Sequence, residues 1–266
     1  MTPHAILIEQ DRSLPEPQNL PGQDEVHLWC VDLLRERFYL DQLQEVLSWD
    51  ERRRSERFCF EADRDRFLLT RSILRILLAR YTGKVASQMC FDTNKFGKIH
   101  LCCTGLGQAS AALRFNISHS GALAVLAFVC AREVGVDVES VQAQIGTEEQ
   151  AELMFMPSER ALIRAGSLIL QREACCKYWV SKEAYVKAIG TGLTTPLNSF
   201  NIAFQPRAHK FTVLSGKGCS EGRSWTGRNF YPYKDYIGAL VLQGDDWDLK
   251  CFNWRSGDVT HEGTTE

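Results

Sequence analysis

Residues 179–193 constrain the fold of this chain more than any other stretch of it. At about 3.6 residues per turn, Trp179, Glu183 and Lys187 stand four apart and form one stripe along a helix. A glycine at position 190 or 192 can end that helix. An exposed Glu-to-Lys pair contributes only about 0.3–0.5 kcal/mol, so the stripe taken alone also fits an ordinary surface helix.

A short strand expected at residues 135–139 carries two acids. Its alternation places Asp137 and Glu139 on one face and two valines on the other. Two carboxylates on one face repel each other unless a cation lies between them. Mg²⁺ fits best, because it is usually held by one or two carboxylates together with substrate phosphates. The strand therefore predicts a magnesium site.

Another strand is expected at residues 115–121, and it ends in hydroxyl groups and one imidazole. Ser118 and His119 lie at this end, where such groups can converge on phosphate oxygens. A lone histidine is ordinarily structural, and that alternative stays open for His119. The apolar run at residues 122–129 follows, as expected of a buried strand.

In this order, the three stretches resemble the signature of the Sfp-type 4′-phosphopantetheinyl transferases. The signature joins a His-containing strand end, an acid-x-acid strand and a Trp-x-x-Lys-Glu-x-x-x-Lys helix that closes in Gly-x-Gly-Leu. The resemblance implies a holo-carrier-protein synthase. Such an enzyme transfers 4′-phosphopantetheine from coenzyme A to a serine of an apo acyl or peptidyl carrier protein and releases adenosine 3′,5′-bisphosphate.

The resemblance also implies roles for individual residues. Asp137, Glu139 and Glu183 would hold Mg²⁺ on the diphosphate, and Lys187 would neutralise phosphate charge. Asp137, Glu183 and Lys187 would form the catalytic set, in which Glu183 could also take the serine proton. A metal-bound carboxylate is a weaker base, so a metal-bound water remains an alternative relay.

The basic run at residues 52–57 usually indicates a solvated helix face. Members of the family place basic residues here to hold the 3′-phosphate of coenzyme A. Arg54 matches one of the family's lysine positions, whereas the other falls on Glu51, which leaves Arg52 or Arg53 as substitutes. An arginine can replace a lysine because its planar fork gives a phosphate two contacts.

Residues 94–99 resemble the family's short aromatic-Gly-Lys turn, whose backbone lies against the adenine. Gly97 would let the chain approach closely and Lys98 would reach a phosphate, although a plain β-turn explains the same residues. The expected coenzyme A contacts are therefore Arg53, Arg54, Phe96, Gly97, Lys98, Ser118, His119 and Lys187.

A helix is also predicted at residues 63–81, where apolar residues recur every three to four positions. Arg66 and Arg71 on this helix could reach a ligand, but each is expected to be a helix-surface charge. Met154 and Phe155 further along belong either to the core or to a docking surface for the carrier, and we favour the core.

We expect an α+β chain of two similar subdomains, each a long helix packed on a mostly antiparallel sheet, with the active site in the cleft between them. The likeness of the halves, a pseudo-dimeric layout, is implied by the resemblance. Residues 1–127 would contact the adenine and 3′-phosphate of coenzyme A. Residues 128–255 would carry the metal site and the catalytic helix, and residues 256–266 would form a disordered tail.

Composition excludes some classes of protein. The net charge of −2 gives no global positive field for nucleic acid, and no pair among the ten cysteines has the Cys-x-x-Cys spacing. The sequence shows no signal peptide and no apolar run of the roughly 18 to 20 residues that would span a membrane. We therefore expect a reduced, cytoplasmic protein with no membrane partner, and by analogy a monomer.

Two other classes stay open. A different Mg²⁺-dependent nucleotide enzyme would use similar groups, although no Gly-x-x-x-x-Gly-Lys-Ser/Thr loop is present. A binding-only relative would hold coenzyme A or a carrier without turnover. Fatty-acid, polyketide and peptide-synthetase carriers are not distinguished by the sequence.

Overall fold

A computed structural model describes residues 19–102, 107–142, 148–205, 209–215 and 224–256. The helices are α1 Leu33–Glu36, α2 Leu40–Leu43, α3 Trp49–Ser55, α4 Glu61–Thr82, α5 Gln108–Ala111, α6 Glu148–Met154, α7 Pro157–Arg164 and α8 Leu168–Ile189. The strands are β1 Glu25–Asp32, β2 Phe91–Thr93, β3 Ile99–Leu101, β4 Leu113–Ser120, β5 Leu123–Cys130, β6 Val134–Ser140, β7 Phe200–Phe204, β8 Lys210–Ser215, β9 Trp225–Phe230, β10 Tyr236–Gln243 and β11 Asp248–Asn253.

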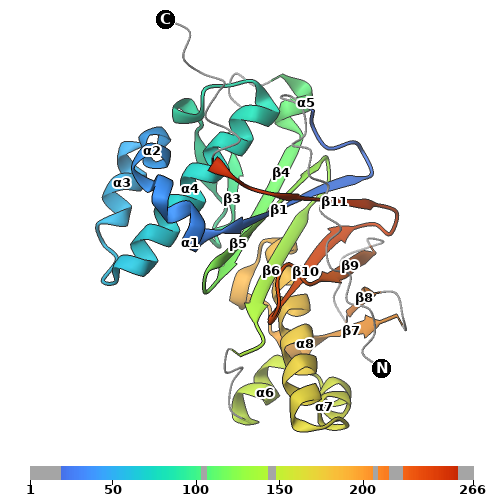
Figure 1. The fold of residues 1–266 in the computed structure, drawn as a ribbon. Coiled ribbons are helices and arrows are strands. Elements are labelled where there is room, and N and C mark those ends of the chain that lie inside the picture. The colour runs from blue at the N-terminus through green and yellow to red at the C-terminus, as the bar shows by residue number, and fades with distance from the viewer. Residues whose placement is uncertain (1–18, 103–106, 143–147, 206–208, 216–223, 257–266) are drawn as a thin grey trace, which may run out of the picture.

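Two sheets and two long helices form four layers (Figure 1). The first sheet has the strand order β11-β1-β5-β4, and the second has the order β6-β10-β9-β8-β7. Helix α4 packs on the outer face of the first sheet and α8 on the outer face of the second, each over its own hydrophobic cluster. A third cluster fills the space between the sheets. This arrangement confirms the α+β class, whereas the pseudo-dimeric likeness of the halves stays a prediction.

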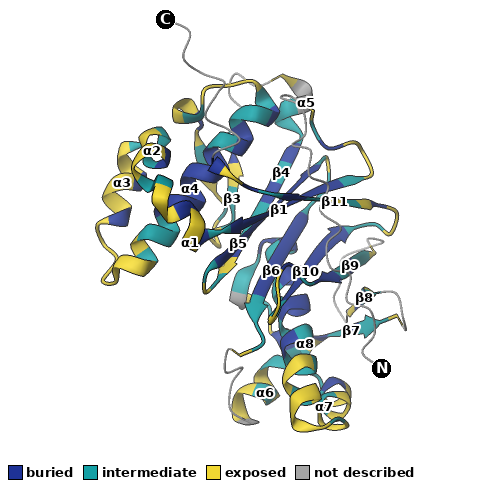
Figure 2. Ribbon diagram, viewed as in Figure 1, coloured by how far each residue is buried: buried dark blue, intermediate teal, exposed yellow. Residues whose placement is uncertain are grey.

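The strand β5 shows why its sequence is a continuous apolar run. Leu126 and Phe128 contribute to the cluster under α4, and Val125 and Ala127 contribute to the cluster between the sheets. Both faces of the strand are therefore buried, as the dark blue centre of Figure 2 shows. A strand buried on both faces needs apolar side chains at every position rather than at alternate ones.

The predicted long helices are present with slightly different ends. The helix expected at residues 63–81 is α4, and the stretch from residue 179 lies in the second half of α8. Phe155 is buried in the cluster under α8 and Met154 packs against it, which confirms the core interpretation of this pair. None of the helices within the described ranges has the length and apolar content that crossing a bilayer requires.

The last strand departs from the predicted layout. Residues 128–255 were expected to form the second subdomain with a mostly antiparallel sheet, but β11 within this range pairs parallel with β1 in the first sheet. Ser256, predicted to begin a disordered tail, is buried, and its N–H donates to Glu36 Oε2 at 3.2 Å. The chain thus returns to the first sheet at its end, and the rest of the expected tail, residues 257–266, lies outside the described residues.

Candidate functional site

A cavity of about 500 Å³ lies between α4, β4, β6 and α8. Trp179, Glu183 and Lys187 of α8 all line it, which confirms that the four-residue spacing puts them on one face. Asp137 and Glu139 of β6 line the same cavity, while Val136 and Val138, which alternate with them, are buried between the sheets. The alternation in the sequence therefore predicted both faces correctly.

A glycine brings β6 and α8 together. A Cβ atom added at Gly135 would lie 2.0 Å from the carbonyl oxygen of Ala184 and 2.4 Å from the backbone nitrogen of Ala188. Any other residue here would force the helix away from the strand. Because the helix lies so close, Lys187 Nζ reaches Asp137 Oδ1 at 2.6 Å.

Strand β4 supplies hydroxyl groups to the acids of β6. Ser118 Oγ donates to Asp137 Oδ1 at 2.7 Å and accepts from Lys187 Nζ at 2.9 Å. Ser120 Oγ donates to Glu139 Oε2 at 2.6 Å. Each acid thus has a serine partner from the neighbouring sheet, and one acid also has a lysine.

The three carboxylates are close enough to influence one another. Burial, followed by the negative charge of Asp137, raises the pKa of Glu183 to about 7, and Lys187 offsets only part of this. Burial also raises the pKa of Glu139. Asp137 Oδ2 and Glu183 Oε1 are buried and have no hydrogen-bond partner among the described residues. At the end of the cavity formed by β6 and α8, three carboxylates therefore have one lysine beside them among the described residues.

This imbalance suits a hard cation. Within the described part of the chain, no three His, Cys, Asp or Glu side chains are grouped so that they could hold a metal ion as they stand. The donor chemistry nevertheless fits Mg²⁺, because carboxylate oxygens are the ligands that it prefers and two of them are free. Asp137, Glu139 and Glu183 remain the residues expected to hold it.

His119 lies near the end of β4 and lines the same cavity as the acids. Burial of the ring, followed by the positive charges of Arg66 and Lys187, lowers the pKa of His119. The imidazole thus lies near two positive charges and the negative charge of Asp137, and an anion bound there would also favour protonation of the ring. These surroundings favour a ligand-binding role over a core role.

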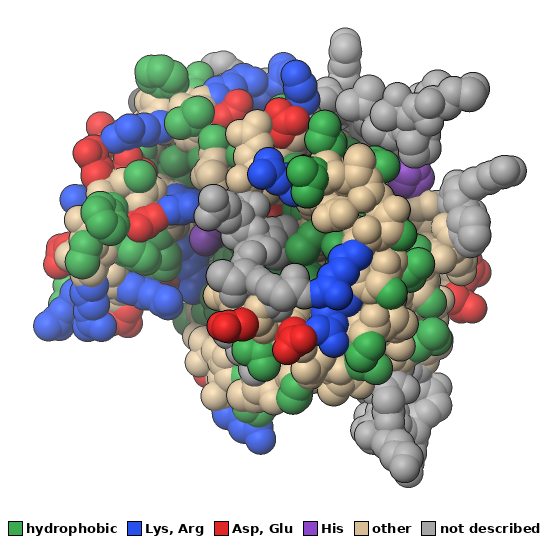
Figure 3. Space-filling view, turned by 90° about the horizontal axis from the view of Figure 1, so that it is seen from below, with side chains coloured by type: hydrophobic (Ala, Val, Ile, Leu, Met, Phe, Trp, Pro, Cys, Tyr) green, Lys and Arg blue, Asp and Glu red, His purple; other side chains and the backbone are tan. Residues whose placement is uncertain are grey.

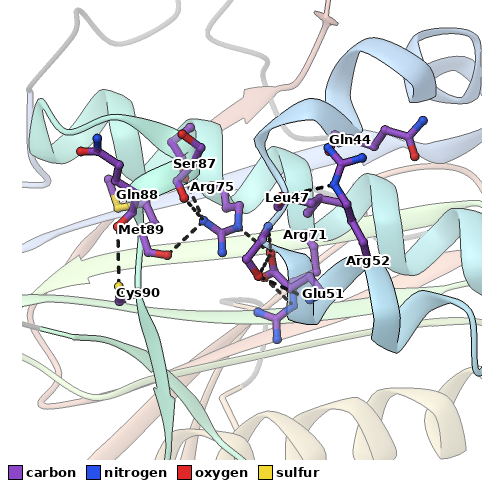
Figure 4. A network of polar contacts seen from close by, with 12 residues as sticks. Gln44, Leu47, Glu51, Arg52, Arg71, Arg75, Ser87, Gln88, Met89 and Cys90 are labelled. Carbon is purple, nitrogen blue, oxygen red and sulfur yellow. Dashed lines mark hydrogen bonds and ion pairs between the residues drawn. The ribbon is translucent and has the colours of Figure 1, made fainter.

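Of the basic run, Arg54 is the arginine that lines the cavity within the described residues. The guanidinium of Arg53 lies over the ring of Trp49 at 5.0 Å instead, so the structure does not bring this predicted ligand to the site. Arg52 donates to the carbonyl oxygens of Gln44 and Leu47 (Figure 4) and is not among the residues that line the cavity. The structure thus favours Arg54 among the three candidates.

Residue 51, where the sequence departs from the family's pattern, is part of the fold. Glu51 is buried, and its carboxylate caps the start of α3 by accepting the N–H of Ser48 at 3.1 Å. The same oxygen accepts from Arg75 Nε at 2.7 Å (Figure 4). Glu51 is therefore a partner of helix α4 rather than a surface residue.

The turn between β2 and β3 holds the end of α8. Gly97 has a φ of 89° and lines the main cavity, and Phe96 beside it is half exposed. Lys98 Nζ donates to Glu133 Oε2 at 2.7 Å, Ala188 O at 2.8 Å and Val134 O at 3.3 Å. All three donors of this ammonium are used, so a contact of Lys98 with phosphate would require one of these bonds to be exchanged.

One residue of the recognised helix pattern has a role that the sequence did not assign. Lys182 is completely buried and lies 2.8 Å from Glu159 Oε2 of α7, which is itself buried. The sequence held a signal for this buried position, since Tyr178, Tyr185 and Ile189 place apolar side chains on the same face of the helix.

The expectation that Arg71 is a surface charge is wrong, because this residue is buried.

Comparison with known proteins matches both halves of the chain. Residues 133–241 match the family model described as the 4′-phosphopantetheinyl transferase superfamily, and residues 36–131 match the model described as 4′-phosphopantetheinyl transferase, N-terminal.

Among the relatives, the 4′-phosphopantetheinyl transferase HetI of Nostoc sp. is 33% identical over 242 residues, which are 91% of this chain and 98% of that protein. The 4′-phosphopantetheinyl transferase Sfp of Bacillus subtilis is 29% identical over 162 residues, which are 61% of this chain and 68% of that protein. A crystal structure of a holo-(acyl-carrier-protein) synthase from Bacillus anthracis in complex with CoA (3′,5′-ADP) covers 42% of this chain and 94% of that one, with 17% identity and a TM-score of 0.36.

Proposed function

This chain belongs to the 4′-phosphopantetheinyl transferase superfamily, and we propose that it transfers the 4′-phosphopantetheine group of coenzyme A to a serine of an apo carrier protein with the help of Mg²⁺. The observation that carries the proposal is the meeting of Asp137, Glu139, Glu183 and Lys187 in one cavity. Two elements supply them, and both match the order of the family's signature.

The reaction requires one bond to form and one to break. The serine oxygen attacks the β-phosphorus of coenzyme A, and the bond from that phosphorus to the bridging oxygen of the diphosphate breaks. Adenosine 3′,5′-bisphosphate leaves, and the serine proton passes to a base. Transfer of this kind depends mainly on positioning and on stabilising charge.

The chain's own residues suit these tasks. Among the described residues, the ammonium of Lys187 donates to Asp137 and Ser118, which leaves one of its three donors for a phosphate oxygen. Glu183, with a pKa of about 7, can accept a proton near neutral pH, and a bound water is the alternative base. Mg²⁺ held by Asp137, Glu139 and Glu183 would supply further charge stabilisation to the diphosphate.

The mass of the carrier tests this function. The protein is incubated with coenzyme A, Mg²⁺ and a panel of apo carriers from fatty-acid, polyketide and peptide synthesis. A mass gain equal to phosphopantetheine on any of them supports the transferase. Tight coenzyme A binding with no mass gain on the whole panel would instead favour the binding-only alternative.

A pair of variants on one helix tests the residue assignment. Glu183→Gln keeps the shape but removes the charge, so the transfer rate should fall by at least about 10²-fold, the effect of losing a general base. Glu173→Gln removes an exposed carboxylate of the same helix and should leave the rate unchanged. Equal rates for the two variants would remove Glu183 from the mechanism. That the protein acts as a cytoplasmic monomer stays a prediction. Light scattering can measure its oligomeric state.

A further inference from the structure

We propose that Asn94 is a positioning residue for the transfer reaction, because its side-chain amide holds the turn between β2 and β3 at a fixed distance from the end of α8. The inference rests on the proposed function for the identity of the ligand. Asn94 is not among the expected contacts of coenzyme A, and it acts through its bond to Gly190.

Asn94 organises the turn between β2 and β3. Its side-chain Oδ1 accepts the N–H groups of Phe96 and Lys98, each at 2.9 Å. Its backbone adds two bonds of 2.9 Å, in which its N–H donates to Lys98 O and its carbonyl oxygen accepts from the N–H of Gly97. An asparagine side chain that bonds to the backbone of its own turn stabilises the turn conformation. The turn is therefore one rigid unit built around Asn94.

The other end of the same amide is bonded to α8. Asn94 Nδ2 donates to Gly190 O at 2.7 Å. Two N–H groups point at Oδ1, so that atom is the acceptor and the orientation of the amide is determined. Gly190 ends α8 with a φ of 69°. A residue of the first half of the chain thus bonds to the helix that carries Glu183 and Lys187.

The contact leaves no room for a side chain at position 190. A Cβ atom added to Gly190 would lie 2.9 Å from Asn94 Nδ2 and 3.1 Å from Lys98 Cδ, so the turn lies directly against the helix backbone. Lys98 also bonds to Ala188 O, but its flexible four-carbon stem can keep that bond over a range of positions. The short side chain of Asn94 allows no such range. Asn94 therefore sets the distance between the turn and the helix.

The turn and the end of α8 form two walls of one space. A second cavity, of about 240 Å³, is lined by Phe96 and Gly97 of the turn and by Gly190 at the helix end. It adjoins the main cavity, since Gly97 and Lys187 line both. The bond of Asn94 joins these two walls, so it sets the width of the second cavity. A ligand that occupies both cavities is held between the turn and Lys187.

Charge alone does not provide such a fixed geometry. Lysine and arginine side chains gather on the side of the molecule that carries α3 (Figure 3). Such charges attract any anion and increase the rate of encounter. Affinity also depends on how much freedom is lost on binding, and less is lost when the groups that contact the ligand are already in place. The fixed turn thus contributes affinity by preorganisation and keeps the donor beside Lys187.

Two variants remove the bond to α8 and keep the turn. Asn94→Asp retains an acceptor for the N–H groups of Phe96 and Lys98 but has no donor for Gly190. Asn94→Ser has a neutral acceptor whose side chain is one bond shorter and does not reach Gly190. Calorimetry with the full chain measures the affinity for adenosine 3′,5′-bisphosphate, and transfer kinetics give kcat and the KM for coenzyme A.

Both variants should bind the nucleotide roughly 3- to 10-fold more weakly and should raise the KM for coenzyme A by a similar factor, as expected for the loss of one hydrogen bond. The kcat should stay at the parent value, because Lys187 keeps its bond to Asp137. Asn198→Asp is the matched control. Asn198 also donates a side-chain N–H to a backbone carbonyl, Glu152 O at 3.0 Å, and is not among the residues that line the two cavities. This control should keep the parent affinity and KM.

A structural role alone would lower the free energy of unfolding of the Asn94 variants and leave the affinity of the folded protein unchanged, and this result would overturn the proposal. A lower kcat with unchanged affinity would also overturn it. If the parent modifies a carrier while the Asn94 variants bind the nucleotide as the parent does, the proposed function stands and the inference fails. If no carrier is modified while these variants lose affinity, the proposed function fails and the positioning of the nucleotide stands.

Discussion

Replacing Lys182 by Met should destabilise this protein strongly without touching the cavity. The ammonium of Lys182 is completely buried and donates to the carbonyl oxygens of Phe200 at 2.6 Å and Leu197 at 2.8 Å. Its third partner is Glu159 Oε2 at 2.8 Å. The residue thus connects α8 to α7 and to the start of β7.

The magnitude follows from what the substitution leaves behind. Removing one partner of a buried ion pair costs about 3–5 kcal/mol, because the other charge stays buried without compensation. Glu159 would keep two backbone donors, the N–H groups of Met156 at 2.9 Å and Ile202 at 2.8 Å. These two bonds still stabilise the carboxylate, so we expect the free energy of unfolding to fall by about 3 kcal/mol, the lower end of that range.

Urea unfolding followed by circular dichroism measures this loss. The matched control is Lys250→Met, because Lys250 pairs with Glu25 at 2.5 Å but both side chains are partly exposed. Exposed pairs contribute about 0–1 kcal/mol, so the control should change the free energy of unfolding by no more than that. A loss below about 1 kcal/mol in Lys182→Met, equal to the control, would refute the reasoning from burial.

Three further predictions concern the site. Lys98→Met removes the ammonium that bonds to the end of α8, so the free energy of unfolding should fall by about 2 kcal/mol in urea titrations. An unchanged free energy of unfolding would contradict a stabilising role of these bonds. In metal-free protein the pKa of Glu183 is raised from 4.5 to about 7, so the folded state binds this proton more tightly than the unfolded state does. The free energy of unfolding should therefore fall as the pH rises from about 5 to about 7. Glu183→Gln should flatten this slope, and an unchanged slope would contradict the assignment. His119→Ala should weaken coenzyme A binding by about 1.5–3 kcal/mol in calorimetry, and unchanged affinity would return His119 to a structural role.

The periodicity of the sequence predicted which side chains share a face. Asp137 and Glu139 needed only the alternation of a strand, and Glu183 and Lys187 needed only the turn of a helix. These are local properties, and the structure confirms them. The meeting of the two pairs in one cavity was implied by the resemblance to a family, because no local pattern states which helix lies on which strand.

Long-range contacts could not be predicted in this way. The parallel pairing of β11 with β1 joins residues near the two ends of the chain, and an alternating strand gives no sign of its partner. The basic positions show the same limit. Glu51 directly precedes the basic run and was expected to be a departure from the family's pattern, and Arg71 on an amphipathic helix was expected to be a surface charge. Both are buried, because Glu51 pairs with Arg75 and lies 3.8 Å from Arg71.

The charged residues of α8 show how one pattern combines two tasks. Lys182 and Glu183 are neighbours, so their side chains point about 100° apart around the helix. Lys182 is bonded to Leu197 and Glu159 in the interior of the second half of the molecule, and these bonds fix the rotation of α8 about its axis. The rotation in turn directs Glu183 and Lys187 into the cavity. A pattern of three charges can therefore be required for activity even though one of them never meets the ligand.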